Sequence, residues 1–171
     1  VSGSPGATWT LPDLTLPGAS TLSIRNLDPV SFSGPSITVT NSLTTGGTVT
    51  VDLPGTLEVG TYPLIAYPVG GSIGGAGFGA FQIGTLPRGV AASLSDIDNV
   101  VTLQISGVNS LVWRGNAGPE WDVNATQNWT LGGIPDRYLD DDNVVFNDTA
   151  TGVTTINLAA AVAPSSVTFD N

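Results

Sequence analysis

The chain reads SLVWRGNAGPEWDVNATQNWT at residues 110–130, GGIPDRYLDDDNVVFND at 132–148 and TGVTTINLAAAVAPSSVTFDN at 151–171. Short runs rich in Val, Thr and aromatic residues alternate here with the turn residues Gly, Pro, Asn and Asp. β-Branched and aromatic residues favour strands, whereas Gly, Pro, Asn and Asp favour the turns between them. These stretches are therefore typical of a β-structure.

The same period of two governs the rest of the chain, and no segment of ten or more residues has the 3.6-residue period of a helix. Strands are predicted at 21–25, 36–40, 48–53, 62–67, 80–83, 90–94, 100–105, 110–114, 143–147, 153–158 and 166–169. An all-β fold follows, with two packed sheets in a sandwich or jelly-roll arrangement. A short β-solenoid is the alternative, although no repeat of about 20–25 residues can be aligned.

Three segments organise the chain. Residues 1–20 contain three prolines and are predicted to form an extended arm or edge strand, since proline cannot donate to a sheet ladder. This arm could pack on its own domain or complete the sheet of another subunit. Residues 21–109 form a β-rich half, and residues 110–171 form a module rich in Trp and Asp.

The charge balance excludes several partners. The net charge is −10, with 14 acidic residues, four arginines, no lysine and no histidine. Nucleic acid and anionic membranes are poor partners because they attract clustered Lys and Arg. No apolar run approaches the roughly 18–20 residues that span a bilayer, so membrane insertion is not expected. Methionine is absent even at position 1, which is expected of a processed N-terminus or an excerpt.

Catalysis has few candidate groups in this chain. Without His, Cys or Lys, the usual nucleophile and base pairs cannot form, and only carboxylates remain. Neither Glu58 nor Glu120 sits at a spacing that marks a glycosidase pair. The sequence therefore predicts no enzyme and no obligatory cofactor.

Metal binding is one interpretation of the acidic run at Asp140, Asp141, Asp142 and Asn143. Asp136 and Asp148 add to the crowding of negative charge. Calcium would suit such oxygen ligands, although the EF-hand pattern is missing. A solvated acidic turn is the other interpretation, so Ca²⁺ is a candidate ligand only.

The tryptophans of the module also have two interpretations. Trp113, Trp121 and Trp129 lie eight residues apart and could form either a buried core or an exposed platform for sugars. Three sequons, at Asn124, Asn128 and Asn147, would permit N-glycosylation in a suitable secretory host.

A family resemblance adds to this picture. The pattern LVWRGNAG…W…QNWT…DDDNVVFND…TINL…PSSVTFDN resembles the tryptophan-containing module of bacterial autotransporter-associated β-strand repeat proteins. The preceding GTVTVDLPGTLEVGTYPLIAYPVGGSIGG…LPRGVAASLSDIDNVVTLQIS is similar to a segment that closes a β-solenoid in that group. The resemblance covers about two-thirds of the chain, implies a secreted, β-rich structural or adhesive protein, and brings no catalytic residues.

The order of these two parts suggests a junction between units. The closing segment precedes the opening module, and PSSVTFDN would run naturally into VSGSPGA. We therefore expect copies of the chain to follow one another in an extracellular or cell-surface filament, with strand addition at the joint. The candidate junction residues are Val1, Trp9, Leu11, Val167 and Phe169. A carbohydrate-binding adhesin module, with surface glycans as partners, is the alternative.

Overall fold

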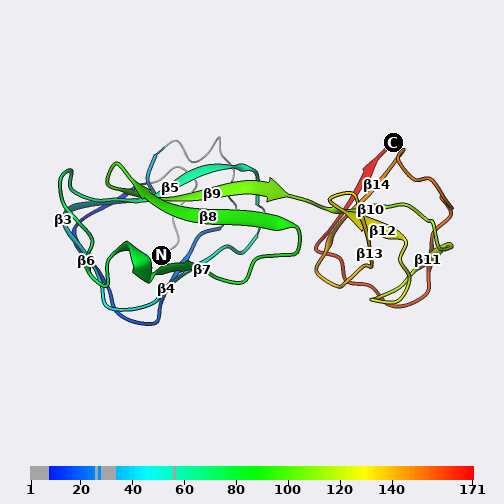
Figure 1. Ribbon diagram of the computed structural model, residues 1–171, viewed down its shortest axis with the longest axis horizontal. Helices are drawn as coiled ribbons and strands as arrows, with labels where there is room; N and C mark the ends of the chain where they lie inside the picture. Colours follow the sequence, from blue (N-terminus) through cyan, green and yellow to red (C-terminus); the bar gives the residue numbers. More distant parts are fainter. Residues whose placement is uncertain (1–7, 26, 28–33, 56) are drawn as a thin grey trace. The chain divides into compact units, whose positions relative to one another are not determined.

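A computed structural model describes residues 8–25, 27, 34–55 and 57–171. The chain divides into two compact units, unit 1 (residues 1–86 and 90–108) and unit 2 (residues 87–89 and 109–171). Figure 1 shows that nearly all regular structure is β-strand, and among the described residues the single helical element is the 3₁₀ turn Phe78–Ala80. No helix among the described residues is long and apolar enough to cross a membrane.

Unit 1 is a stack of parallel strands. Its larger sheet contains β1 (Trp9–Leu16), β3 (Ile37–Thr45), β5 (Gly60–Ala66), β6 (Gly74–Gly75), β8 (Val90–Ile97) and β9 (Val100–Val108). Its smaller sheet contains β2 (Ser20–Ser23), β4 (Val49–Asp52) and β7 (Phe81–Ile83). Within each sheet, strands from successive passes of the chain lie side by side in parallel.

The register defines three successive coils. In the larger sheet Trp9 pairs with Ile37, and Ile37 pairs with Ile65. In the smaller sheet Ser20 pairs with Val49, and Val49 pairs with Phe81. Each partner therefore lies 28 to 32 residues further along the chain (37 − 9 = 28 and 81 − 49 = 32). Such a fixed period of parallel pairing is the signature of a solenoid.

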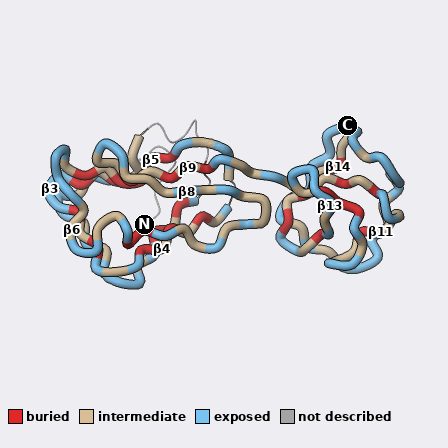
Figure 2. Tube along the Cα trace, in the orientation of Figure 1, coloured by how far each residue is buried: buried red, intermediate tan, exposed pale blue. Residues whose placement is uncertain are grey.

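One apolar core lies between the two sheets of unit 1. β3 and β5 contribute Val39, Leu43 and Leu64, and β4 contributes Val49 and Val51. All of these side chains are buried, and Figure 2 shows buried residues along the facing strands. Alternation along each strand directs every second side chain into this core.

An antiparallel hairpin terminates unit 1. β9 pairs with β5 on one side and with β8 on the other, both antiparallel. The two-residue turn at Asp98 and Asn99 has φ values of 54° and 61°, the left-handed conformation that tight hairpin turns require. The hairpin brings Val101, Leu103 and Ile105 into the core, so it covers the apolar end of the stack.

Unit 2 combines parallel and antiparallel pairing. Its main sheet has the order β13 (Ile134–Asp136), β12 (Trp129–Leu131), β10 (Leu111–Trp113), β14 (Asn143–Asn147) and β16 (Ser166–Asp170). β10, β14 and β16 are parallel, and the short strands β11 (Glu120–Trp121) and β15 (Asn157–Leu158) form a second parallel pair. The coils of this unit are therefore stacked in the same way as those of unit 1.

The structure confirms the all-β class. The two sheets of unit 1 share one core, and the parallel register gives them the solenoid connection that the sequence analysis kept as its alternative. The repeat escaped detection because its period is 28 to 32 residues rather than about 20–25. β6, β11, β12 and β13 lie outside the predicted strands. β1 lies within the predicted arm, at one end of its sheet, with Pro12 at a shift in its register.

Candidate functional site

The open end of unit 2, which we define as β15 and β16, is the first candidate. β16 pairs with β14 through residues 143–147 and 166–170. No strand pairs with the other edge of β16 or β15 in the part of the chain that the structure describes. The unpaired N–H and C=O groups of an edge strand are a template for pairing with another strand.

Apolar side chains accompany this free edge. Val167 and Phe169 pair in register with Val144 and Phe146, which belong to the core. Register partners point to the same face of a sheet, so Val167 and Phe169 continue the inner columns of unit 2. They are nevertheless 44% and 69% exposed, and Leu158 of β15 is 61% exposed. The exposed run toward the C-terminus is visible in Figure 2.

A recess of about 370 Å³ adjoins β16. Its apolar lining includes Trp113, Phe146 and Phe169, and its polar lining includes Asn147, Asp148 and Asn171. The rings of Phe146 and Phe169 are stacked with their centroids 5.2 Å apart. The recess therefore offers an aromatic wall beside hydrogen-bonding groups, with no basic side chain in its lining.

The first coil of unit 1, formed by β1 and β2, is the second candidate. Each strand is at the end of its sheet, so each has an edge without a partner among the described residues. Trp9 is 42% exposed, whereas its register partner Ile37 is buried. Leu11 is half-buried against the core of unit 1. Val1, the remaining predicted junction residue, lies outside the described residues.

The acidic run belongs to a hydrogen-bonded turn in unit 2. Asp140 Oδ1 accepts hydrogen bonds from the Tyr138 hydroxyl at 3.0 Å and from the Ala163 N–H at 2.9 Å. Asn143 Oδ1 accepts one from the Ser166 hydroxyl at 2.7 Å. Asp141 is exposed and has a φ of 69°. These bonds fasten the turn to the segment that leads into β16.

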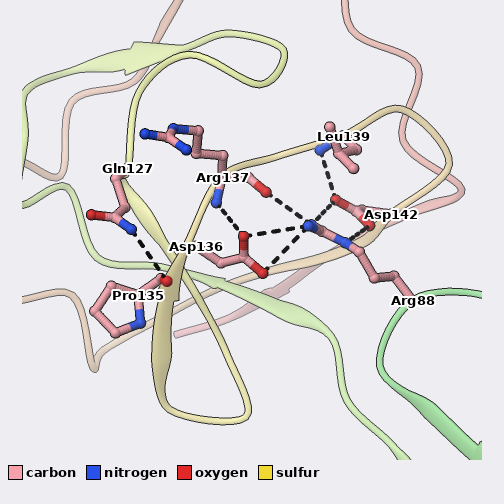
Figure 3. Close-up of polar contacts among 7 residues, drawn as sticks. All are labelled: Arg88, Gln127, Pro135, Asp136, Arg137, Leu139 and Asp142. Atoms are coloured by element: carbon pink, nitrogen blue, oxygen red, sulfur yellow. Dashed lines mark hydrogen bonds and ion pairs between the residues drawn. The ribbon is translucent and has the colours of Figure 1, made fainter.

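Arg88 contacts the buried member of this run, as Figure 3 shows. Its Nε and Nη2 atoms donate to the two carboxylate oxygens of Asp142 at 3.0 and 2.6 Å. Its Nη1 lies 3.3 Å from Asp136 Oδ2, and Nη2 also donates to the carbonyl of Arg137 at 2.8 Å. The Leu139 N–H donates to Asp142 Oδ2 at 2.7 Å. The charge of Asp142 is thus balanced by a bidentate arginine.

This arrangement bears on the calcium interpretation. Asp142 and Asp136 share the guanidinium of Arg88, while Asp140 faces protein donors. Within residues 8–25, 27, 34–55 and 57–171, no group of three or more acidic side chains is placed to hold a metal ion. Calcium at residues 140–143 stays a prediction, and it would have to displace these contacts.

The tryptophans form the core of unit 2. Trp113, Trp121 and Trp129 are all buried, and the Trp113 and Trp129 rings meet edge to face with centroids 5.0 Å apart. Trp121 packs against Trp129 and Phe146 at 5.3 and 5.4 Å. The structure therefore agrees with the interpretation of these tryptophans as a buried core. They do not form an exposed platform for sugars.

The three sequons lie in different environments. Asn128 is buried, its Nδ2 donates to the Glu120 carbonyl and its Oδ1 accepts from the Ala117 N–H, each at 2.8 Å. A glycan on this Nδ2 is incompatible with the folded unit. Asn124 is exposed, and Asn147 is half-buried with its Oδ1 bonded to Thr149. Asn124 and Asn147 remain as candidate glycosylation positions.

Arg88 and the recess were not found from the sequence. Arg88 lies 54 residues from Asp142, and an isolated Leu-Pro-Arg-Gly carries no pairing signal. The recess depends on the stacking of β14 and β16, which the sequence predicts as strands but not as neighbours. Comparison with protein-family models, with curated proteins and with solved structures finds no match for the chain.

Proposed function

We propose that the chain is a structural subunit or repeat unit of an extracellular bacterial filament or surface assembly, joined head to tail by strand addition. The free, apolar open end of unit 2 is the observation that supports this proposal. The extracellular and bacterial parts rest on the resemblance to autotransporter-associated β-strand repeat proteins.

The free edges of the outermost strands favour association between copies of the chain. An exposed edge strand with exposed apolar side chains favours association with a further strand. Such edges are found in the first coil of unit 1, at β1 and β2, and in the last coil of unit 2, at β15 and β16, with no partner strand among the described residues. When copies of a chain associate through two different surfaces, each copy leaves one surface free for the next. Such a contact builds a filament unless the rotation between neighbouring copies closes a ring.

Charge makes assembly of this kind sensitive to salt. Each copy carries a net charge of −10, so association has to overcome repulsion between copies. Salt screens that repulsion over about 8 Å at physiological ionic strength. Assembly is therefore expected to strengthen as salt is raised, whereas binding to a polycation would weaken.

The test compares two matched variants of the 171-residue chain. Phe169→Asp places a charge at the open end of unit 2, and Ile97→Asp places the same charge at a residue 63% exposed in the terminal hairpin of unit 1. Sedimentation velocity and negative-stain images should show concentration-dependent polymers for the wild type and Ile97→Asp, and monomers for Phe169→Asp. A wild type that stays monomeric at every protein and salt concentration would overturn the proposal.

The alternative is a carbohydrate-binding adhesin module, and the recess beside β16 is the observation that favours it. An aromatic ring next to Asn and Asp side chains suits a neutral sugar, since the ring stacks on the apolar face and the polar groups bond the hydroxyls. A glycan array with wild-type and Phe169→Ala protein tests this function. Binding by monomeric wild type that Phe169→Ala abolishes would favour the adhesin over the filament.

A further inference from the structure

We propose that Trp9 of a second copy of this chain enters the recess beside β16 and stacks on Phe169, with β1 of that copy lying parallel to β16. The inference rests on the proposed end-to-end assembly and names its contact. It assigns a role to the recess and to the exposed indole.

Unit 2 contains a column of stacked aromatic rings that ends at β16. Phe146 and Phe169 are in-register partners on parallel strands, and their rings are stacked at 5.2 Å with an interplanar angle of 19°. Neighbouring strands lie about 4.7–4.9 Å apart, so a further strand would place its own side chain one such step beyond Phe169. An aromatic ring at that position continues the column.

The second step identifies the ring. β1 directs its side chains at positions 9 and 11 toward the same face as the buried Ile37 and Val39. Trp9 is the aromatic residue of β1 and β2, and it is left 42% exposed at an edge that pairs with no strand among the described residues. Leu22, the inward side chain of β2, is already buried. Of the aromatic and apolar side chains that β1 and β2 direct toward the core, Trp9 therefore keeps a large surface exposed to solvent.

The third step is polar complementarity. Asp148 lines the recess and supplies carboxylate acceptors, while an indole supplies a single neutral N–H donor. The one charged residue of β1, Asp13, follows Trp9 by four positions, which is roughly 13 Å along a strand. Asp13 also accepts hydrogen bonds from Asn41 and Ser42 within its own unit. The approaching strand therefore brings no carboxylate into the recess.

The fourth step is direction. Strands of each stack follow one another in chain order and in parallel, from β1 to β3 to β5 and from β10 to β14 to β16. Placing β1 of the next copy beside β16 continues that order without reversing a strand. The contact is heterologous, so each copy uses Trp9 once and Phe169 once.

A complementation experiment tests this pairing. Trp9→Asp removes one partner and Phe169→Asp removes the other, and each variant alone should sediment as a monomer. In a 1:1 mixture the Phe169→Asp variant supplies an intact Trp9 and the Trp9→Asp variant supplies an intact Phe169. The mixture should therefore form dimers that cannot grow into longer polymers. A mixture that stays monomeric while the wild type assembles would overturn the Trp9–Phe169 contact but leave end-to-end assembly standing.

Acrylamide quenching provides an independent readout. Trp113, Trp121 and Trp129 are buried, so Trp9 is the exposed tryptophan of the four. Quenching should fall as the wild type assembles, and Trp9→Phe should lack the quenched component while still assembling. Assembly without a fall in quenching would contradict the inference alone, whereas absence of wild-type assembly would contradict the proposed function as well.

Discussion

Unit 1 and unit 2 are built on the same plan and end differently. Both stack parallel strands in chain order, but the last coil of unit 1 is covered by the antiparallel strands β9 and β8. β16, the last strand of unit 2, has one edge that pairs with no strand in the part of the chain that the structure describes, and it exposes Val167 and Phe169. The outermost strand of a parallel stack can always pair with one more strand. The stack therefore ends either where an antiparallel strand covers it or at an edge that another strand can join.

The two units are also held together by different interactions. The core of unit 1 consists mainly of aliphatic side chains from two sheets. Unit 2 packs three tryptophans in its core and fastens its acidic turn with Arg88, whose partner Asp142 is almost fully buried. Aromatic packing and a buried ion pair are thus more prominent in unit 2 than in unit 1. The predictions below test this contrast.

Arg88→Ala is expected to have the largest effect. It leaves the buried carboxylate of Asp142 without its cation, which costs about 3–5 kcal/mol. Hydrogen exchange should show lost protection in β12 and β14, with protection of β4 and β5 retained. Arg25→Ala, at an exposed arginine of unit 1, should change stability by less than about 0.5 kcal/mol. Equal losses in both variants would mean that the buried pair contributes nothing specific.

Leu103→Ala tests the closed end. Leu103 of β9 is fully buried, so its truncation leaves a cavity and costs about 2–5 kcal/mol. Leu158→Ala is the matched change at the open end, where the side chain is mostly exposed, and it should cost less than about 0.5 kcal/mol in the monomer. Urea unfolding at low protein concentration measures both. Equal costs would contradict the difference between the two ends.

Asn128→Ala tests the polar support of unit 2. It removes the two hydrogen bonds that the buried Asn128 side chain makes with the Ala117 N–H and the Glu120 carbonyl, and at about 0.5–1.5 kcal/mol for each bond the loss is about 1–3 kcal/mol. The matched change in unit 1 is Asn41→Ala, because Asn41 donates to Asp13 at an exposed position. That variant should lose about 0.5 kcal/mol or less, and thermal unfolding followed by tryptophan fluorescence compares the two.

The sequence predicts strands better than it predicts their neighbours. Period-two patterns locate most strands, and the adjacent Asp98 and Asn99, residue types that favour tight turns, form the hairpin turn between β8 and β9. Strands such as β11 and β13 are too short for a period to appear. Parallel pairing depends on contacts between residues about 30 positions apart in the chain. The sequences of paired strands such as β1 and β3 have little in common except alternating apolar residues, so they cannot be aligned as repeats.

The candidate site follows the same division. Trp9, Val167 and Phe169 were predicted as junction residues because of their place in apolar segments near the two ends of the sequence. Their exposure and the recess could not be derived, since both depend on which strand lies beside which. Arg88 was missed for the same physical reason, because a pair 54 residues apart leaves no local pattern.

The smallest expected effect is the response to alkaline pH. Burial, followed by the hydrogen bond to Asp140, raises the pKa of Tyr138 above its ordinary value of 10.0. Burial and Asp96 raise the pKa of Tyr67 in the same direction in unit 1. A tyrosine whose pKa is raised by folding contributes stability that is fully present below pH 10. That contribution is lost as pH rises through the folded pKa, because the unfolded chain loses its proton first.

Tyr138→Phe and Tyr67→Phe separate the two contributions. The free energy of unfolding should fall between pH 10 and pH 11.5 in the wild type, and each variant should show a shallower fall. The larger change is expected for Tyr138→Phe, because Tyr138 is the more deeply buried of the two and burial is the main cause that raises both pKa values. In a Trp9→Phe background the remaining tryptophans all lie in unit 2, so their fluorescence reports on unit 2, and exchange at β5 and β9 reports on unit 1. If Tyr138→Phe leaves the alkaline slope of unit 2 unchanged, the hydroxyl is not held neutral by its buried position, and the turn that leads into β14 depends on other contacts.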